Sequence, residues 1–157
     1  MKRHYLLFLK VERGHTMRAL FDETLYTGND IIDEQHKELI GRIDKLLLLC
    51  ENEKPAKREA IQLLDYLSDY TDYHFAEEEK LQEELGYPGL AEHKKKHEEL
   101  RAVVRELHEM LVELEGPTEE FVKQVYENVA EWLYYHIRGF DRSVAEYAFM
   151  RENASRL

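Results

Sequence analysis

The chain contains few of the residues that interrupt helices and only one cysteine. Its 157 residues include 3 Pro, 7 Gly and 1 Cys. A lone cysteine excludes an intrachain disulfide and a metal site built from several thiolates, and it suits a reducing compartment, so we expect a cytoplasmic protein. No apolar run is long enough to span a membrane, so we expect no membrane association.

Positive charge is also scarce. Lys and Arg number 22 against 33 Asp and Glu, which gives a formal net charge of -11. An acidic surface repels the phosphates of nucleic acids and of anionic membranes, so neither is an expected partner. Charged residues nevertheless make up 35% of the chain, and many of them are Glu, Lys and Arg, which favour helices. The composition therefore predicts an all-α protein.

The N-terminal segment has the outline of a secretion signal. A short basic start precedes an apolar run at residues 5–9. That run is short, Lys10 interrupts it, and no cleavage site of small residues follows, so a signal peptide is not predicted. We expect residues 1–16 to be an N-terminal extension of unknown role and residues 17–157 to form one domain.

Four segments with helical periodicity follow an aromatic, turn-rich stretch. Their apolar residues recur at three- and four-residue steps, as on the buried face of a helix. N-cap residues or Gly and Pro breakers separate them. Together they predict an up-down-up-down four-helix bundle with an N-terminal irregular arm. The first segment starts near residue 29 and ends around 51–55, the second covers 57–85, the third 90–114, and the fourth starts near 118.

The informative feature of the sequence is the placement of histidine. Five of the eight histidines, with one Glu and one Asp, fall on the inward faces of the four helices. Four-residue steps on the second and third helices turn the chain by roughly 400°, which places each pair on one face. The five-residue step from His136 to Asp141 makes those side chains diverge by roughly 140°, unless Gly139 permits a distortion. The candidate metal ligands are His36, His74, Glu78, His93, His97, His136 and Asp141.

This set of donors indicates a dinuclear metal site. Imidazole and carboxylate together suit Fe, Zn, Mn or Cu. Seven ligands exceed the four of a tetrahedral zinc site, but they match two octahedral ions that share bridging carboxylates. The competing interpretation is a purely structural bundle, because a single core histidine is usually a packing residue. Since seven buried polar groups without partners would be costly, we favour the metal site.

The pattern of ligands resembles that of the hemerythrin family. It consists of one His on the first helix, then His-x-x-x-Glu, His-x-x-x-His and His-x-x-x-x-Asp, and the resemblance covers about residues 19–150. The residues around the motifs are also similar, although Phe21 stands where bacterial members usually carry Trp. The similar flanking segments are Ile31–Lys37, His74–Glu78, Tyr87–Pro88 and Trp132–Ile137.

The resemblance implies a cofactor of two Fe ions, a non-haem di-iron centre with an oxo or hydroxo bridge. O2 is then expected to bind end-on at the iron with two histidines and to be held as hydroperoxide. Leu133 resembles the family's apolar residue beside bound O2, and Trp132 is expected next to the site; a plain core role for both stays open. The implied ligands are His93, His97 and His136 on one iron, His36 and His74 on the other, and Glu78 and Asp141 as bridges.

The resemblance further implies reversible O2 binding, as in an oxygen carrier, store or sensor, and no enzymatic activity. Two alternatives stay open. One is a di-iron redox enzyme or sensor that handles O2, peroxide or NO, although a His-rich set of ligands disfavours strongly oxidising chemistry. The other is iron storage or repair, although two irons per chain make a poor store. We expect a monomer or a small homo-oligomer, and the sequence does not identify a protein partner.

Overall fold

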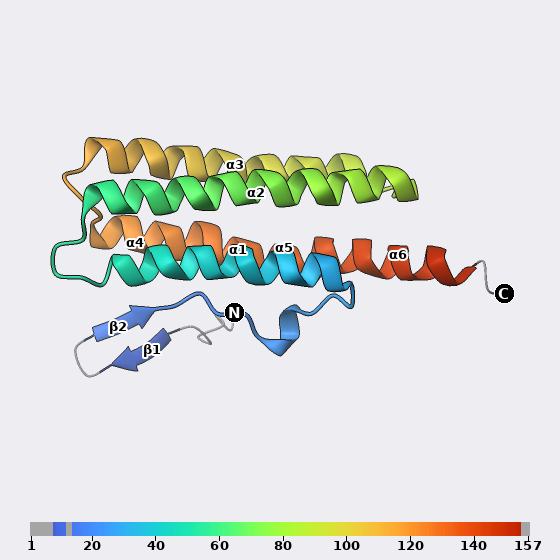
Figure 1. Cartoon of the computed structure of the whole chain (residues 1–157), viewed down its shortest axis with the longest axis horizontal. Coiled ribbons are helices and arrows are strands. Elements are labelled where there is room, and N and C mark those ends of the chain that lie inside the picture. Colours follow the sequence, from blue (N-terminus) through green and yellow to red (C-terminus); the bar gives the residue numbers. More distant parts are fainter. Residues whose placement is uncertain (1–7, 12–13, 155–157) are drawn as a thin grey trace.

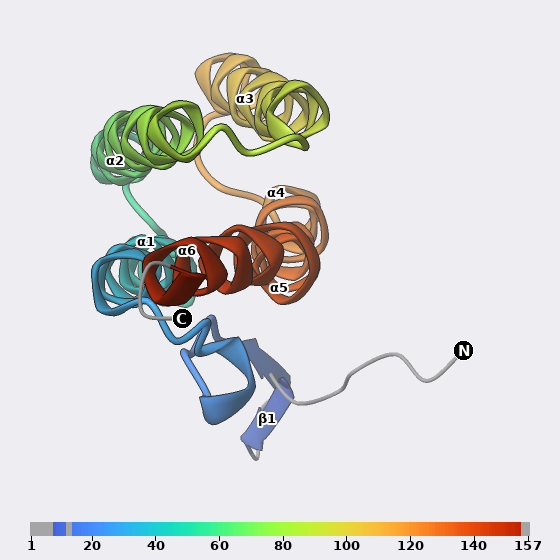
Figure 2. The ribbon, with the colours of Figure 1, turned by 90° about the vertical axis from the view of Figure 1, so that its right-hand side faces the viewer.

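The computed structural model describes residues 8–11 and 14–154. Three long helices come first: α1 (Asp30–Leu49), α2 (Lys57–Leu85) and α3 (Leu90–Glu113). Each runs antiparallel to the one before it, and a fourth, segmented helix returns beside them (Figure 1). Viewed along their axes, the four lie at the corners of a bundle (Figure 2). The prediction of an all-α, up-down-up-down four-helix bundle is confirmed.

Most helix ends lie where the sequence predicts them, although α1 ends at Leu49, before the predicted end at 51–55. The side chain of Asn29 accepts a hydrogen bond from the backbone N–H of Ile32 at 3.1 Å and caps α1. Gly86 ends α2 in the left-handed conformation, with φ of 64°, which glycine adopts at little cost. Thr118 caps the fourth helix by accepting from the backbone N–H of Phe121 at 3.1 Å. Local capping chemistry therefore defines these three helix ends.

The fourth helix alternates between two kinds of helical turn. Two of its segments, η2 and η3, are π-helical. In η3 the backbone N–H of Arg142 donates to the carbonyl of Ile137, five residues earlier. Such turns widen a helix locally and often occur at functional sites. The five segments are α4 (Glu119–Val125), η2 (Tyr126–Ala130), α5 (Glu131–His136), η3 (Ile137–Asp141) and α6 (Arg142–Ala154).

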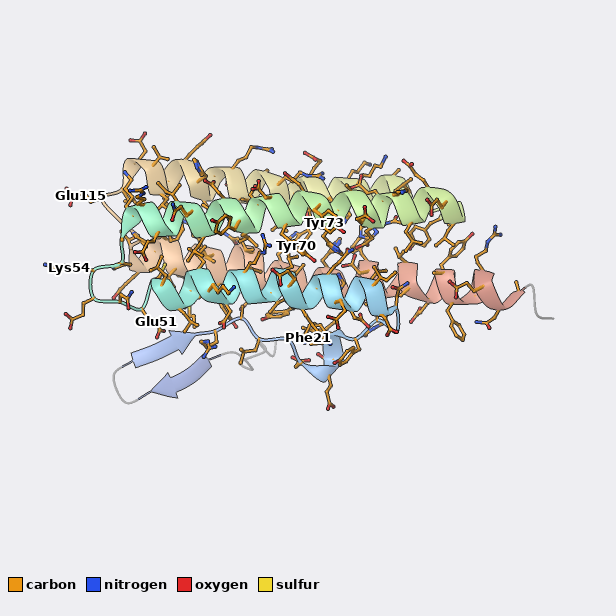
Figure 3. All side chains as sticks on the ribbon, viewed as in Figure 1. Phe21, Glu51, Lys54, Tyr70, Tyr73 and Glu115 are labelled. Carbon is orange, nitrogen blue, oxygen red and sulfur yellow. The ribbon has the colours of Figure 1, made fainter. Side chains whose placement is uncertain are left out.

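The core of the bundle is apolar near the end where the connections after α1 and α3 lie. Leu46 and Phe121 are fully buried there. The charged side chains of Glu51, Lys54 and Glu115 lie around the same end in the solvent (Figure 3). Among the described residues, no helix combines the length and the hydropathy needed to cross a membrane.

An N-terminal hairpin precedes the bundle, and the sequence analysis did not predict it. Strands β1 (Phe8–Val11) and β2 (Gly14–Met17) pair antiparallel. The chain then forms an irregular arm, as predicted, with one 3-10 turn, η1 (Glu23–Leu25). Residues 1–7 and 12–13 of the predicted extension lie outside the described residues. The division of the chain at residue 16 stays a prediction.

Hydrogen bonds fasten the arm to the fourth helix. The hydroxyl of Tyr134 accepts from the backbone N–H of Leu20 at 3.1 Å. The guanidinium of Arg138 donates to the hydroxyl of Thr24 at 2.7 Å. These contacts hold the arm along the outside of the bundle (Figure 1), where η1 contacts η3.

A second attachment joins the arm to α1 and yields a stability prediction. Asp44 accepts from Arg18 at 2.8 and 2.7 Å and from the buried backbone N–H of Ala19 at 3.0 Å. We expect Asp44→Ala to lower the free energy of unfolding by about 1–3 kcal/mol, because a buried N–H loses its acceptor. Chemical denaturation measures the change.

The matched control is Glu38→Ala. It removes the exposed pair of Glu38 with Arg42, four residues apart, at 2.8 Å. Such exposed pairs contribute about 0.3–0.5 kcal/mol. Equal losses in the two variants would contradict an anchoring role for Asp44.

Candidate metal centre

All seven residues predicted as ligands meet inside the bundle. One comes from α1, two from α2, two from α3, one from α5 and one from η3. At most 3% of the surface of any of them is exposed. They lie farther from the connections after α1 and α3 than the apolar core residues Leu46 and Phe121 do.

The π turn η3 explains the five-residue step between His136 and Asp141. On a regular helix these side chains diverge, but a turn closed by an i to i+5 hydrogen bond returns to the same face after five residues. The Nε2 atom of His136 lies 3.1 Å from Oδ1 of Asp141. Steric crowding does not require glycine at position 139, because a Cβ atom there would have no neighbour within 4 Å. The π turn of the backbone, and not the glycine, therefore brings His136 and Asp141 to the same face of the helix.

The donor atoms form two overlapping groups. Within each group, one atom from every member lies within 4.8 Å of the others. Glu78 and Asp141 belong to both groups. The first group is Glu78, His93, His97, His136 and Asp141, and the second is His36, His74, Glu78 and Asp141.

Several of these buried donors are close together without being hydrogen-bonded. Nε2 of His36 lies 2.7 Å from Oδ2 of Asp141, yet neither atom has a hydrogen-bond partner. The same holds for Nε2 of His74 and Oε2 of Glu78, 3.1 Å apart. Because buried polar atoms are normally satisfied, this cluster calls for an additional partner. Donors that face a shared centre and not each other are suited to a cation.

Comparison with known proteins identifies the family. A model described as "Hemerythrin HHE cation binding domain" matches residues 27–148. The chain belongs to the hemerythrin family. This confirms the resemblance found in the sequence.

Hemerythrin relatives extend over most of the chain. A bacteriohemerythrin of Stenotrophomonas maltophilia is 32% identical over 128 residues, which cover 81% of this chain and 79% of the relative. A myohemerythrin of Riftia pachyptila is 31% identical over 122 residues, covering 78% and 87%. A crystal structure of wild-type hemerythrin superposes with a TM-score of 0.64 at 27% identity, covering 76% of this chain and 88% of that one. The shared part is the bundle.

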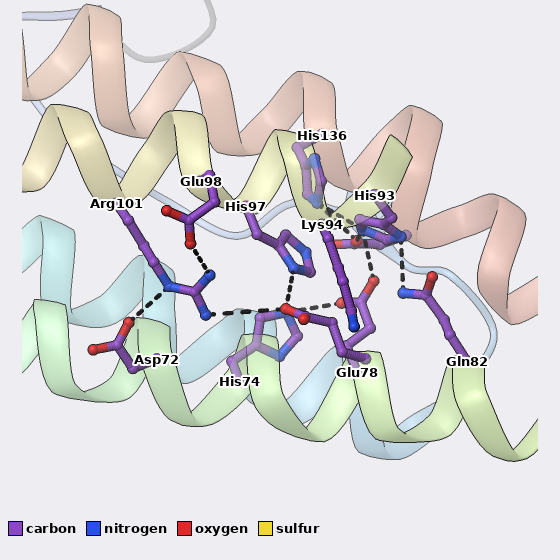
Figure 4. A network of polar contacts seen from close by, with 12 residues as sticks. Asp72, His74, Glu78, Gln82, His93, Lys94, His97, Glu98, Arg101 and His136 are labelled. Carbon is purple, nitrogen blue, oxygen red and sulfur yellow. Dashed lines mark hydrogen bonds and ion pairs between the residues drawn. The ribbon is translucent and has the colours of Figure 1, made fainter. Parts of the chain in front are cut away.

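Three residues that the sequence analysis missed orient the histidines of this hemerythrin fold. Nδ1 of His74 lies 2.7 Å from Oε1 of Gln35. Nδ1 of His93 lies 2.8 Å from the side-chain amide of Gln82 (Figure 4). Nδ1 of His97 lies 2.8 Å from Oε2 of Glu79. In each case the outer ring nitrogen is held, so that Nε2 points into the cluster. Such outer partners fix the orientation and tautomer of a histidine ligand.

Burial and the neighbouring charges shift the pKa values of the cluster's members in different directions. Burial, followed by the positive charges of His93 and His136, lowers the pKa of His97 to about 2. Burial also disfavours charge on His93, but its contacts with Asp141 and Glu78 outweigh burial and raise its pKa to about 9. Burial would raise the pKa of Asp141, but the charge of His136 and hydrogen bonds outweigh it and hold that pKa well below its usual value. A retained proton on His93 thus supplies cationic charge between carboxylates.

The two residues predicted to line an O2 pocket lie in α5. Leu133 is completely buried. The half-buried ring of Trp132 stacks on His136 at 4.5 Å with an interplanar angle of 14°. Phe140 stacks on His136 as well, at 5.3 Å and 11°. Trp132 therefore lies beside the cluster, as expected, while a pocket role for Leu133 and Trp132 stays a prediction.

Proposed function

We propose that this hemerythrin-family protein holds two iron ions in the buried cluster and binds O2 reversibly there. The observation that carries the proposal is the sharing of both carboxylates, Glu78 and Asp141, by two donor groups. Two ions in these groups would be bridged by both carboxylates. Imidazole and carboxylate donors suit iron, and no thiolate is among them.

The residues present fit such a centre. The unpartnered buried atoms include nitrogens of His36, His74 and His97 and oxygens of Glu78 and Asp141, and metal bonds would satisfy them. The proposed ligands are His93, His97 and His136 for one ion, His36 and His74 for the other, and Glu78 and Asp141 for both. When bound, the iron pair supplies the electrons that hold O2 reversibly.

The chain contributes orientation through the outer partners of the histidines. A ring that binds metal through Nε2 carries its proton on Nδ1 and donates it outward. Gln35 offers an oxygen to His74, as this requires. Gln82 places its amide nitrogen against Nδ1 of His93 and leaves its own Oε1 without a partner. Rotating the side-chain amide of Gln82 by about 180° lets Nδ1 of His93 donate to Oε1 of Gln82. Metal binding at Nε2 of His93 then leaves the polar atoms of both residues with partners.

The chain also excludes water from the cluster. Leu133 is completely buried, and the Trp132 and Phe140 rings pack on His136. A dry surrounding slows irreversible oxidation of a bound complex, which favours a carrier, store or sensor over an enzyme.

Metal analysis combined with an ultraviolet–visible spectrum tests the function. We expect about two irons per chain, a colourless reduced form without air, and a coloured band in air that disappears when O2 is removed. Irreversible oxidation without such a band would replace this proposal with a redox enzyme. Protein that takes up no metal when iron is supplied would overturn it.

Leu133 offers a test of the dry pocket. We expect Leu133→Ala to lower the free energy of unfolding by about 2–5 kcal/mol and to speed the irreversible loss of the coloured band, because the cavity admits water. The rate of loss in air is measured at a temperature where the variant stays folded. Leu133→Met preserves most of the side-chain volume and serves as the control. Equal rates in wild type and both variants would contradict a role for Leu133 in the O2 pocket.

A further inference from the structure

One of the three outer partners differs in charge from the other two. Gln35 and Gln82 are amides, whereas Glu79 places a carboxylate 2.8 Å from Nδ1 of His97. A carboxylate oxygen only accepts, so His97 carries its proton on Nδ1 and its Nε2 is free of one. That Nε2 atom is buried and has no hydrogen-bond partner. The contact therefore selects the tautomer that points a lone pair into the cluster.

Glu79 also connects the buried cluster with the protein surface. The side chain of His97 is 0% exposed, whereas that of Glu79 is 18% exposed. Oε2 of Glu79 lies 3.9 Å from a guanidinium nitrogen of Arg101. Arg101 is itself held by Asp72 at 3.1 Å and by Glu98 at 2.6 Å (Figure 4). The carboxylate of Glu79 therefore lies between the candidate ligand His97 and the positively charged guanidinium of Arg101.

We propose that Glu79 is a positioning residue for the metal centre, which makes His97 a stronger donor than its neighbours, and that Arg101 limits this effect. A carboxylate that accepts the outer N–H of an imidazole ligand raises the basicity of its other nitrogen. The inference rests on the proposed function, since it concerns the same site. It distinguishes His97 from His74 and His93, whose outer partners are amides.

The first test measures the affinity of the metal-free protein for Zn2+ by competition with a chromogenic chelator. We expect Glu79→Gln, which keeps the shape but removes the charge, to weaken one of the bound ions by about 10-fold or more. Glu77→Gln is the matched control, because Glu77 is an exposed neighbour on the same helix. It removes the same charge and should change the affinity less than 2-fold.

The second test measures the reduction potential of the iron-loaded protein. Loss of the Glu79 charge disfavours the ferric state, so we expect Glu79→Gln to shift the one-electron equilibrium roughly tenfold toward the ferrous state, about +59 mV. Arg101→Gln removes the opposing charge and should shift the potential the other way. A merely structural contact would not give shifts of opposite sign in the two variants.

The outcomes separate this inference from the proposed function. If wild type binds no metal, both are overturned. If wild type binds two ions and Glu79→Gln matches Glu77→Gln in affinity and potential, only the role of Glu79 is overturned. Weaker binding in Glu79→Gln with recovery in Glu79→Asp supports the role, since aspartate restores the charge.

Discussion

Replacing Glu78 with alanine is expected to leave the protein unable to hold two iron ions per chain. One oxygen of Glu78 lies 3.1 Å from Nε2 of His74, and the other lies 3.0 Å from Nε2 of His93. Because Glu78 belongs to both donor groups, its loss takes a ligand from each. His74→Ala takes a ligand from one group only, so it should lower the loading less. Iron per folded chain is the measurement.

The control for this prediction is the exposed neighbour Glu77. Glu77→Ala has the same helical context and the same change of charge, but its side chain faces solvent. It should load iron like wild type. Two irons in Glu78→Ala would show that this carboxylate does not bridge, and the assignment of both groups would have to be revised.

Removing the metal is expected to lower the Tm of the wild-type protein by about 10 °C. A ligand present at 1,000 times its Kd stabilises a protein by about 4.1 kcal/mol. For a domain of this size, 1 kcal/mol moves the Tm by roughly 2–4 °C. The physical reason is that ions in the cluster join all four helices, while the metal-free protein keeps buried donors without partners.

Calorimetry of the loaded and chelated protein measures this shift. Glu78→Ala is the control, since a protein with a disrupted site should gain little stability from iron. Equal Tm values for loaded and chelated wild type would mean that the cluster is satisfied without metal, and the site would then lose its physical argument.

The sequence was sufficient for the helices because their ends are local. Asn29, Gly86 and Thr118 act on the turns next to them, so capping rules that need no tertiary information placed the boundaries. The ligands were predictable for a related reason. Histidines and acids that recur on an apolar helix face have no local role there, and their coincidence on four helices indicates a common site.

Other features depend on tertiary contacts or on weak signals. The five-residue step from His136 to Asp141 indicated that a regular helix would not bring the two side chains together. It did not indicate which change of the backbone would do so. Glu79 contacts a residue 18 positions away, and no local spacing reveals that pair. Gln82 had a usable signal, since it is a polar residue four positions after Glu78 and is completely buried. Strands of four residues are too short for a periodic pattern.

The attachment of the arm to the fourth helix bears on the order in which the chain folds. The bond between Leu20 and Tyr134 joins residues 114 positions apart, whereas consecutive helices of the bundle are linked by short connections. Contacts across a long stretch of chain require a greater loss of entropy before they form. We therefore expect the arm to dock after the bundle has assembled and to detach first. Amide hydrogen exchange at Leu20 should accordingly be faster than in the centre of α1.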